Sequence, residues 1–265
     1  MLSLQHITKC FFKGTLNEVA ALNDICLDVN AGEFITIIGS NGAGKSTLLK
    51  TIAGMIQPDL GRIDLNGTNV TTDPVYRRAQ YIGRIAQDPN ESTCAVMTIE
   101  ENMAMAGKRG KARGLRWAIT PSKRAEFRQL LAEIGLGLET RLSVRVGTLS
   151  GGQRQALGLL MATMTRPKVL LLDEHLANLD PKTAELVMRL TGRLVADHRL
   201  TTLMVTHSMH HAIQWGNRLI MMHEGRIIFD MAGEEKKKLR VDDLVKKFYQ
   251  ESREELTEDR MLLSA

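Results

Sequence analysis

Nine consecutive residues are the strongest candidates for chemistry in this sequence. They are Gly39, Ser40, Asn41, Gly42, Ala43, Gly44, Lys45, Ser46 and Thr47, and they match the phosphate-binding pattern G-x-x-x-x-G-K-[ST]. Glycines at this spacing let the backbone curl until several N–H groups converge on phosphate oxygens, at the positive end of a helix dipole. Lys45 can then reach the β- and γ-phosphates, and the Ser46 hydroxyl can bind Mg²⁺. The segment predicts a site for a nucleoside triphosphate.

Two adjacent carboxylates, Asp173 and Glu174, follow the apolar run Val169–Leu172. In enzymes with a phosphate loop, an acid at this place holds Mg²⁺. The second acid, Glu174, can accept a proton from an attacking water. An acidic pair after a strand is by itself usually a helix-capping turn. In a chain that also carries a phosphate loop, the catalytic interpretation is favoured.

A second glycine-rich segment, Leu149–Gln153, precedes a predicted helix. Gly151 and Gly152 expose backbone there, so the chain carries two helix starts suited to anions. One nucleotide cannot easily use both ends of the same molecule. Two chains that face each other head to tail can, with each segment closing over the nucleotide of the other chain.

The elements that must position these residues alternate between short strands and helices, as in an α/β protein. Half-buried antiparallel strands are predicted at Leu2–Ile7 and Ile25–Val29, and buried strands at Phe34–Ile38, Val169–Leu172 and Thr202–Val205. Helices are predicted at Ser46–Ala53 and from Pro181 to about Ala196, the latter capped by Asp180. A hairpin of Arg218–Met222 and Arg226–Phe229 turns at Glu224 and Gly225.

The middle third interrupts this alternation. From about Asp88 to Leu160 the pattern is helical, with helices predicted at Ile99–Ala106, Lys123–Ile134 and Gly152–Thr163. We interpret residues 88–160 as a helical subdomain inserted into one domain that spans residues 1–235. Residues 236–265 then form a short helix, Val241–Gln250, and a charged tail.

Taken together in this order, the motifs resemble those of an ABC transporter ATPase subunit. Leu149–Gln153 corresponds to the signature, Leu170–Glu174 to Walker B, Asp180 to the D-loop, Gln87 to the Q-loop and His207 to the switch histidine. The resemblance runs from about Leu2 to Asp230. It implies a P-loop NTPase fold of the ABC type, with a mixed β core, an N-terminal antiparallel β subdomain and the inserted helical subdomain. It also implies ATP and Mg²⁺ as ligands.

The resemblance assigns roles residue by residue. Phe11 would stack on adenine, although Phe12 beside it leaves that assignment open. Ser46, Gln87 and Asp173 would surround Mg²⁺, and Lys45, Glu174 and His207 would carry the catalysis. Ser150, Gly151, Gly152, Gln153 and Asp180 would contact ATP held by the facing protomer. One departure is His175–Asn178, where the family commonly has Pro-Thr-Ser-Ala.

The implied partners are two membrane-spanning permease subunits, a second copy of the chain, and an extracytoplasmic substrate-binding protein. Several longer stretches resemble bacterial importer ATPases that pair with a lipoprotein receptor, some of them linked to aromatic amino acids. They are Arg141–Leu160, Leu170–Asp180, Thr201–His211 and Gly216–Gly225. Import, possibly of amino acids, is therefore the expected function. The alternative is the ATPase of a lipid or peptide exporter.

Composition agrees with a peripheral protein on the inner face of the cell membrane. No apolar run approaches the ~18 residues of a membrane helix, and the N-terminus lacks a secretory signal pattern. The net charge is +5, but only 4% of residues are aromatic, so few bases could be stacked and nucleic acid is not an expected partner. A GTPase is also disfavoured, because the sequence has no Asn-Lys-x-Asp motif.

Two metal hypotheses are weighed and set aside. Cys10, Cys26 and Cys94 are scattered, so we expect small buried hydrophobic side chains with neither a disulfide framework nor a zinc site. His207, His210 and His211 have helical spacing, but no cysteine nearby completes a zinc ligand set, and His207 is predicted at a strand end.

Overall fold

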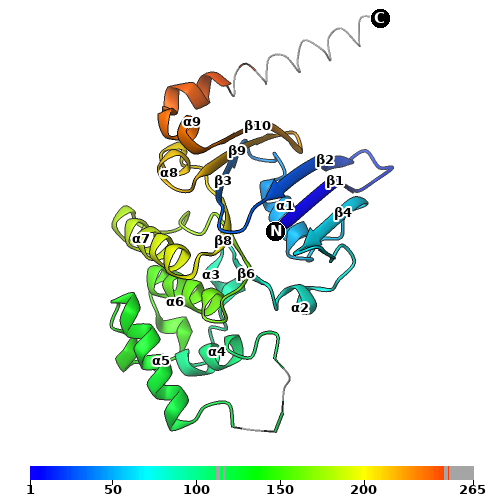
Figure 1. The fold of residues 1–265 in the computed structure, drawn as a ribbon. Coiled ribbons are helices and arrows are strands. Elements are labelled where there is room, and N and C mark those ends of the chain that lie inside the picture. Colours follow the sequence, from blue (N-terminus) through cyan, green and yellow to red (C-terminus); the bar gives the residue numbers. More distant parts are fainter. Residues whose placement is uncertain (112–113, 116, 248–249, 251–265) are drawn as a thin grey trace, which may run out of the picture. The chain divides into compact units, whose positions relative to one another are not determined.

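The computed structural model describes residues 1–111, 114, 115, 117–247 and 250 (Figure 1). The chain divides into two compact units. The first comprises Met1–Ile52, Ile56–Thr71 and the described residues from Met204 onward. The second comprises Ala53–Met55 and the described residues of Thr72–Leu203.

In the first unit, the N-terminal strands form an antiparallel sheet of order β2-β1-β4-β5. Its strands are β1 (Leu2–Phe11), β2 (Val19–Val29), β4 (Leu60–Leu65) and β5 (Thr68–Asn69). Alternate residues such as Leu2, Leu4, Leu27 and Val29 are buried, which is the pattern of a sheet with one solvated face. The two strands predicted here are confirmed, and each is longer than predicted. The strands β4 and β5 were not predicted.

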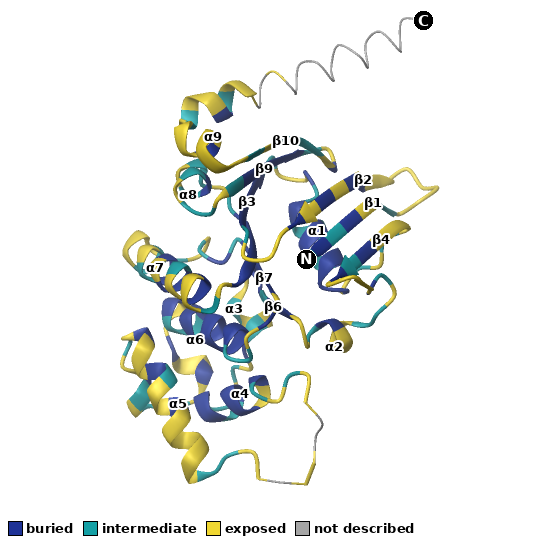
Figure 2. Cartoon of the chain, viewed as in Figure 1, coloured by how far each residue is buried: buried dark blue, intermediate teal, exposed yellow. Residues whose placement is uncertain are grey.

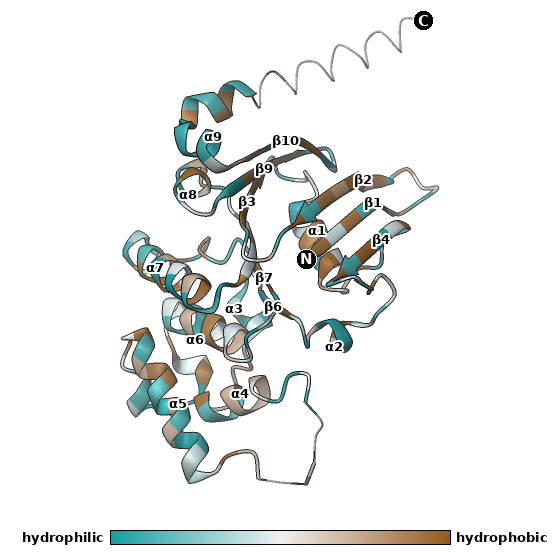
Figure 3. Cartoon of the chain, viewed as in Figure 1, coloured by the Kyte–Doolittle hydropathy of each residue, from teal (hydrophilic) through white to brown (hydrophobic). Residues whose placement is uncertain are grey.

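The phosphate loop follows β3 (Phe34–Gly39), which pairs in parallel with β9 (Arg218–His223). The hairpin is confirmed, because β10 (Arg226–Ala232) pairs antiparallel with β9. Figure 3 shows the hydrophobic colouring of β3 and β9 that accompanies their burial. The helices of this unit include α1 (Lys45–Ile52), α8 (Met209–Gln214) and α9 (Gly233–Lys238). Ile38, Ala212, Leu219, Met221 and Leu244 pack into one core that joins α8 to these strands.

The second unit is dominated by helices. They are α2 (Val75–Arg78), α3 (Pro89–Ser92), α4 (Ile99–Ala106), α5 (Pro121–Ile134), α6 (Gly151–Thr163) and α7 (Pro181–His198), with short 3₁₀ turns at Leu138–Thr140 and Val146–Thr148. Strands β6 (Ile82–Ile85) and β7 (Val169–Asp173) pair in parallel. Strand β8 (Thr201–Val205) divides between the units after Leu203. Strand order is β10-β9-β3-β8 in the first unit and β8-β7-β6 in the second.

Burial along α6 and α7 explains how they form. Helix α7 buries Val187, Leu190 and Leu194 at three- and four-residue spacing and leaves its other face exposed (Figure 2). Helix α6 is buried along most of its length from Gln155 onward, so it belongs to the core of this unit. The predicted C-terminal helix is helical at residues 241–247, whereas positions 248 and 249 lie outside the described residues.

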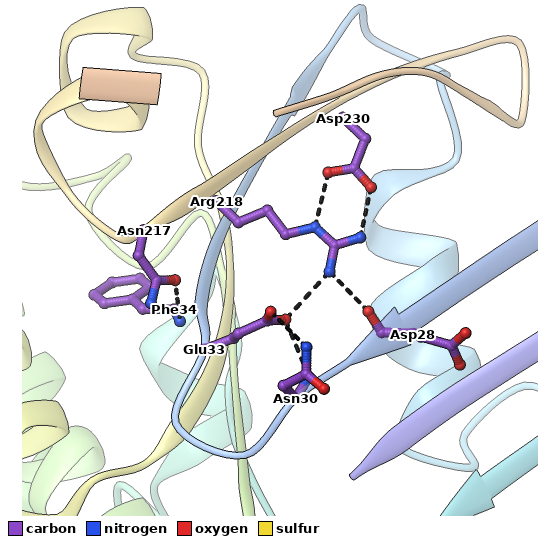
Figure 4. Close-up of polar contacts among 7 residues, drawn as sticks. All are labelled: Asp28, Asn30, Glu33, Phe34, Asn217, Arg218 and Asp230. Carbon is purple, nitrogen blue, oxygen red and sulfur yellow. Dashed lines mark hydrogen bonds and ion pairs between the residues drawn. The ribbon is translucent and has the colours of Figure 1, made fainter. Parts of the chain in front are cut away.

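Arg218 anchors the start of the strand that leads to the phosphate loop (Figure 4). Its guanidinium binds Asp230 through two hydrogen bonds of 2.7 and 2.5 Å, and it also contacts Glu33 at 3.2 Å. The same group donates to the Asp28 carbonyl at 2.7 Å, so it ties β2, the β2–β3 turn and β10 to β9. A planar guanidinium can bind several acceptors at once, because its N–H donors point in fixed directions.

Candidate functional site

The loop between β3 and α1 has a conformation that depends on glycine. Gly39 and Gly44 have φ angles of 151° and 92°, which side-chain-bearing residues rarely adopt. A Cβ on Gly39 would lie 2.1 Å from the Met222 carbonyl oxygen, and a Cβ on Gly44 would lie 2.2 Å from that of Ala21. At Gly42, a Cβ would meet nothing within 4 Å. The loop is therefore pressed against neighbouring backbone at both ends and open at its middle.

Lys45 is the first residue of α1, and it is only 5% exposed. Its ammonium donates to the carbonyl oxygens of Gly39 at 2.9 Å and Ser40 at 2.8 Å. Because burying a cation is costly unless its donors are satisfied, these carbonyls hold the ammonium within the loop. The positive end of the α1 dipole lies at the same place. A buried ammonium, a helix start and an open loop centre together fit a phosphate chain.

A cavity of about 160 Å³ adjoins the start of this loop. Gly39, Ser40 and His207 are among the residues that line it. His207 follows β8, and the neighbouring Thr206 N–H donates to the Ile37 carbonyl of β3 at 3.1 Å. The structure thus brings the predicted switch histidine to the phosphate loop, through pairing of strands that are far apart in the sequence.

The turn between β9 and β10 also touches the loop, which the sequence did not indicate. The Ser40 hydroxyl lies 3.4 Å from Nδ1 of His223, and the Gly225 N–H donates to the Ala43 carbonyl at 3.2 Å. Gly225 in turn accepts a hydrogen bond from the Asn23 N–H at 2.9 Å. The hairpin was predicted from its Glu224-Gly225 turn, but nothing in that pattern shows that it supports the loop.

In the second unit, the predicted acid pair ends strand β7. Asp173 is 4% exposed and Glu174 is half-buried. Glu174 has a φ of 46°, so the chain leaves the extended conformation directly after Asp173. A left-handed residue other than glycine costs roughly 1–3 kcal/mol and persists only where its surroundings impose it. The candidate base is therefore at a conformationally constrained position.

The segment from Ser150 to Gln153 forms a capping box at the start of α6. The Gln153 N–H donates to the Ser150 hydroxyl at 3.2 Å, and the Ser150 N–H donates to the Gln153 side chain at 3.2 Å. Ser150 and Gly151 are exposed, whereas Gly152 is buried, and a Cβ on Gly152 would lie 2.0 Å from Cγ2 of Thr183 in α7. The two helices therefore meet closely where both begin.

Asp180 caps α7, as predicted. Its carboxylate accepts a hydrogen bond from the Thr183 N–H at 3.1 Å. Hydrogen bonds from the side chain and backbone of Thr183 lower the pKa of Asp180, because they favour the charged form. The carboxylate is exposed, so capping leaves it accessible.

A family model described as "ABC transporter" matches residues 22–177. This chain belongs to the ABC transporter family. Over 248 residues it is 43% identical to a protein named "Tyrosine transport ATP-binding protein" from Clostridioides difficile (strain R20291), covering 94% of this chain and 98% of the relative. It is also 34% identical to a "Phosphonates import ATP-binding protein" from Haloquadratum walsbyi, covering 91% of this chain and 76% of that one.

Solved structures agree with the fold. One is a dimeric ATP-binding cassette in a post-hydrolysis state with ADP and Pi, with a TM-score of 0.75, 28% identity, and coverage of 88% of this chain and 98% of that chain. Another is an ABC transporter cassette in its ADP conformation, with a TM-score of 0.75, 28% identity, and coverage of 94% and 98%. The chain is thus an ABC ATPase that binds ATP and couples its hydrolysis to transport. None of the described helices is long and apolar enough to cross a membrane.

The departure from the family pattern after Glu174 has a structural explanation. His175 is 3% exposed, and its Nε2 lies 3.2 Å from the Thr191 hydroxyl of α7. The Thr191 hydroxyl also donates to the Val187 carbonyl at 2.9 Å, within α7. The contact with Thr191 holds His175, the residue directly after the acid pair, against α7.

The predicted adenine contact, its alternative and the Q-loop residue lie at exposed or half-buried positions. Phe11 ends β1 half-buried, with the Lys9 ammonium 5.7 Å from its ring centroid. Phe12 is 70% exposed and has a φ of 54°. Gln87 is exposed in the bend between β6 and α3.

The expectation that all three cysteines are buried hydrophobic side chains was wrong. Cys26 and Cys94 are exposed, and Cys10 is half-buried against Glu18 at 3.3 Å. Sequence spacing did not reveal this, because strand register decides which face Cys10 and Cys26 occupy, and Cys94 lies in the loop after α3. Among the described residues, His207, His210 and His211 are not part of a candidate metal group.

Proposed function

We propose that this ABC ATPase energises the import of an amino acid, with tyrosine or a similar aromatic amino acid as the favoured substrate class. The observation that carries the proposal is the 43% identity to a tyrosine transport ATP-binding protein across nearly the full length of both chains. Relatives at 34% and 33% identity are named as phosphonate and spermidine/putrescine import proteins, which supports import as the direction. An exporter finds no support among these relatives.

The proposed system follows the expectations from the sequence. The chain works on the cytoplasmic side of the membrane with two membrane-spanning permease subunits and an extracytoplasmic substrate-binding protein, which in this group is a lipoprotein. We assign residues 1–235 to the ATPase domain, with the helical subdomain at about 88–160, and residues 236–265 to a short C-terminal helix and a charged tail. The ATPase does not touch the cargo, so the substrate must be tested in the complete system.

The proposed ATP contacts in the first unit come from residues 39–47. Their N–H groups bind the phosphates at the start of α1, and the buried Lys45 ammonium adds the positive charge. The fit rests on the open loop centre and the clashes that a Cβ would cause at Gly39 and Gly44. Phe11 stacks on adenine, with the more exposed Phe12 as the alternative.

The proposed hydrolytic residues are Glu174, His207 and Lys45. Mg²⁺, when bound, would neutralise charge on the β- and γ-phosphates. Ser46, Gln87 and Asp173 offer the oxygen ligands that this ion prefers. Glu174 accepts the proton of the attacking water, and His207, which lines the cavity beside the loop, contacts the γ-phosphate.

The proposed second half of each site comes from another copy of the chain. Ser150, Gly151, Gly152, Gln153 and Asp180 contact ATP held by the facing protomer. The exposure of Ser150, Gly151 and Asp180 supports this role. The similar cassette with ADP and Pi is described as dimeric, which supports the same assembly here.

Uptake in cells that lack this gene tests the function. We expect loss of labelled tyrosine uptake, restored by the wild-type gene and not by Glu174→Gln expressed at the same level. Labelled phosphonate and spermidine serve as parallel substrates. Restoration of phosphonate or spermidine uptake, with tyrosine uptake unaffected throughout, would overturn the amino-acid assignment while leaving the ATPase assignment intact.

A further inference from the structure

Three side chains of different chemistry meet on the exposed face of the β1–β2 pair. They are His6, Asp24 and Cys26, and their ligand atoms all lie within 4.8 Å of one another. Nδ1 of His6 lies 2.8 Å from Oδ1 of Asp24 and 3.7 Å from Sγ of Cys26. The His6 and Asp24 side chains are 76% and 67% exposed, so solvent reaches the group. It is the one such candidate group among the described residues, and it takes no part in the proposed ATP site.

Two opposed β-bulges create this cluster. Leu4 pairs with Leu27 and Ile7 pairs with Ile25, so two residues of β1 stand opposite Cys26 alone. Ile7 pairs with Ile25 and Lys9 with Leu22, so here the extra residue is on β2, at Asn23 and Asp24. Bulges of this kind redirect side chains. Without them, strict alternation could not keep the apolar partners buried and still leave all three polar side chains on the solvent side.

The bulged conformation is held from both sides. His6 and Asp24 have φ angles of 52° and 53°, a region that residues other than glycine rarely occupy. Gly61 of β4 packs against the first bulge, since a Cβ there would lie 2.5 Å from the carbonyl oxygens of Gln5 and His6. The second bulge is held by the Asp24 N–H, which donates to the Thr8 hydroxyl at 3.3 Å. The positions of the three side chains are therefore fixed by the backbone of the bulged strands.

The spacing matches that of a tetrahedral metal site. With Zn–N near 2.0 Å and Zn–S near 2.3 Å, a tetrahedral ion places its nitrogen and sulfur ligands about 3.5 Å apart. The observed separation of His6 Nδ1 and Cys26 Sγ is 3.7 Å. Asp24 accepts the hydrogen on Nδ1, and a cation would replace that proton between the ring and the carboxylate. The His6 N–H donates to Cys26 Sγ at 3.4 Å, and this contact orients the sulfur.

We propose that His6, Asp24 and Cys26 form a binding site for a divalent transition metal of the Zn²⁺ class. Imidazole, thiolate and carboxylate together select borderline ions over Mg²⁺ or Ca²⁺, which prefer oxygen ligands alone. Binding releases the proton of the Cys26 thiol, because the thiolate is the ligand form. Three protein ligands leave a fourth position for water or an added ligand. An open depression of about 500 Å³, lined in part by Asp24, Cys26 and Arg226, leaves room for it.

Cobalt titration of the full-length, reduced protein in a non-chelating buffer without nucleotide tests this site. We expect one Co²⁺ per chain with a thiolate-to-cobalt charge-transfer band in the near ultraviolet, and Zn²⁺ should displace the Co²⁺. Cys26→Ser should abolish the band. His6→Asn tolerates the left-handed backbone but removes the imidazole, so it and Asp24→Asn should each weaken Co²⁺ binding ~10-fold or more.

Cys94→Ser is the matched control, because Cys94 is also an exposed cysteine but belongs to no candidate metal group of the described residues. This variant should keep the band and the affinity. Thermal melts by circular dichroism establish that each variant is folded. Cobalt bound by the histidines near His207 would give no charge-transfer band. Absence of the band in the wild-type protein, its survival in a folded Cys26→Ser variant, or its loss in Cys94→Ser would each overturn the proposal.

Discussion

The phosphate loop and the signature segment are both glycine-rich helix starts, but they are built differently. At the phosphate loop, neighbouring backbone crowds Gly39 and Gly44, and carbonyl oxygens within the loop hold the Lys45 ammonium. At the signature segment, Ser150 and Gln153 satisfy each other in a capping box and leave Ser150 exposed. The first holds a buried cation of its own chain, at the place where we propose that phosphates bind. The second is complete as a helix start, and its proposed ligand comes with another protomer.

This difference shows why the geometry of a single chain indicates a ligand for the phosphate loop but not for the signature segment. A buried cation within a glycine loop has few uses other than binding an anion. A capping box occurs at the start of many helices, so its geometry alone assigns no ligand. A substitution that removes the proposed phosphate contact but keeps the helix cap can show which of the two roles a residue has.

The largest effect is expected from Glu174→Gln, which should trap a stable ATP-bound homodimer. In that dimer the phosphate loop of one protomer faces the signature segment of the other. Glutamine keeps the size of Glu174 but cannot act as a base, so hydrolysis should slow by roughly 10²- to 10⁴-fold while ATP binding survives. Size-exclusion chromatography with light scattering, with and without Mg²⁺ and ATP, measures the dimer. A variant that binds ATP but stays monomeric would contradict head-to-tail pairing, and wild-type turnover would show that Glu174 is not the base.

Ser150→Asp should break the signature segment as a phosphate contact but keep it as a helix cap. Aspartate caps helices about as well as serine, so the melting temperature should change little. A carboxylate facing a γ-phosphate should cost several kcal/mol, which weakens the ATP-dependent dimer by about 100-fold or more. The assay is dimerisation in the Glu174→Gln background.

Thr120→Asp is the control for that experiment. Thr120 caps α5 in the same way, by accepting from the Lys123 N–H, but lies in no predicted ATP contact. It should leave both stability and dimerisation unchanged. Equal dimerisation in the Ser150→Asp and Thr120→Asp variants would show that Ser150 serves only as a cap.

Lys45→Ala should weaken ATP binding while the protein stays folded. Loss of hydrogen bonds from a charged group typically costs ~1.5–3 kcal/mol, or roughly 10- to 100-fold in affinity. Nucleotide titration and a circular dichroism melt test the two halves of the statement. Lys50→Ala, in the last turn of the same helix, is the matched control and should bind ATP normally. Normal affinity in a folded Lys45→Ala variant would mean that the phosphate loop is misassigned.

The smallest effect concerns Lys236, a second buried lysine whose ammonium donates to backbone carbonyls. It is 2% exposed and donates to Ile213, Trp215 and Gly216. Burial lowers its pKa to about 8. In the unfolded chain the pKa returns to about 10.4, so between these values the unfolded state holds more protons. The free energy of unfolding should therefore rise with pH in this range, by up to ~1.4 kcal/mol per pH unit from this group.

The measurement compares urea unfolding of the wild-type protein and Lys236→Met between pH 8 and pH 10. The extra positive slope should disappear in the variant, which should also be less stable by ~1–3 kcal/mol because carbonyls lose their donor. If the free energy of unfolding has the same pH dependence in the wild-type protein and in Lys236→Met, burial does not lower the pKa of Lys236. Unlike Lys45, this lysine should leave ATP affinity unchanged.

Much of the architecture was predictable, because local signals and tertiary packing agree. The cap at Asp180, the buried run before Asp173 and the turn at Gly225 all appear as predicted. The strand β4 was missed, and three of its six residues are exposed, which weakens the apolar alternation. The length of β1 was underestimated because its bulges interrupt the alternation after Leu4.

The sequence by itself determined the phosphate loop, the acid pair and the family, because those motifs depend on residue type and spacing along the chain. Tertiary structure alone decided that His207 lines a cavity with Ser40 and that His223 contacts the same loop. It also decided that Cys26 faces solvent beside His6 and Asp24. These contacts depend on which strands pair and in what register, and a shift of one residue would move strand residues such as His223 and Cys26 to the opposite face. The spacing of residues along one strand does not indicate which strand pairs with it or in what register.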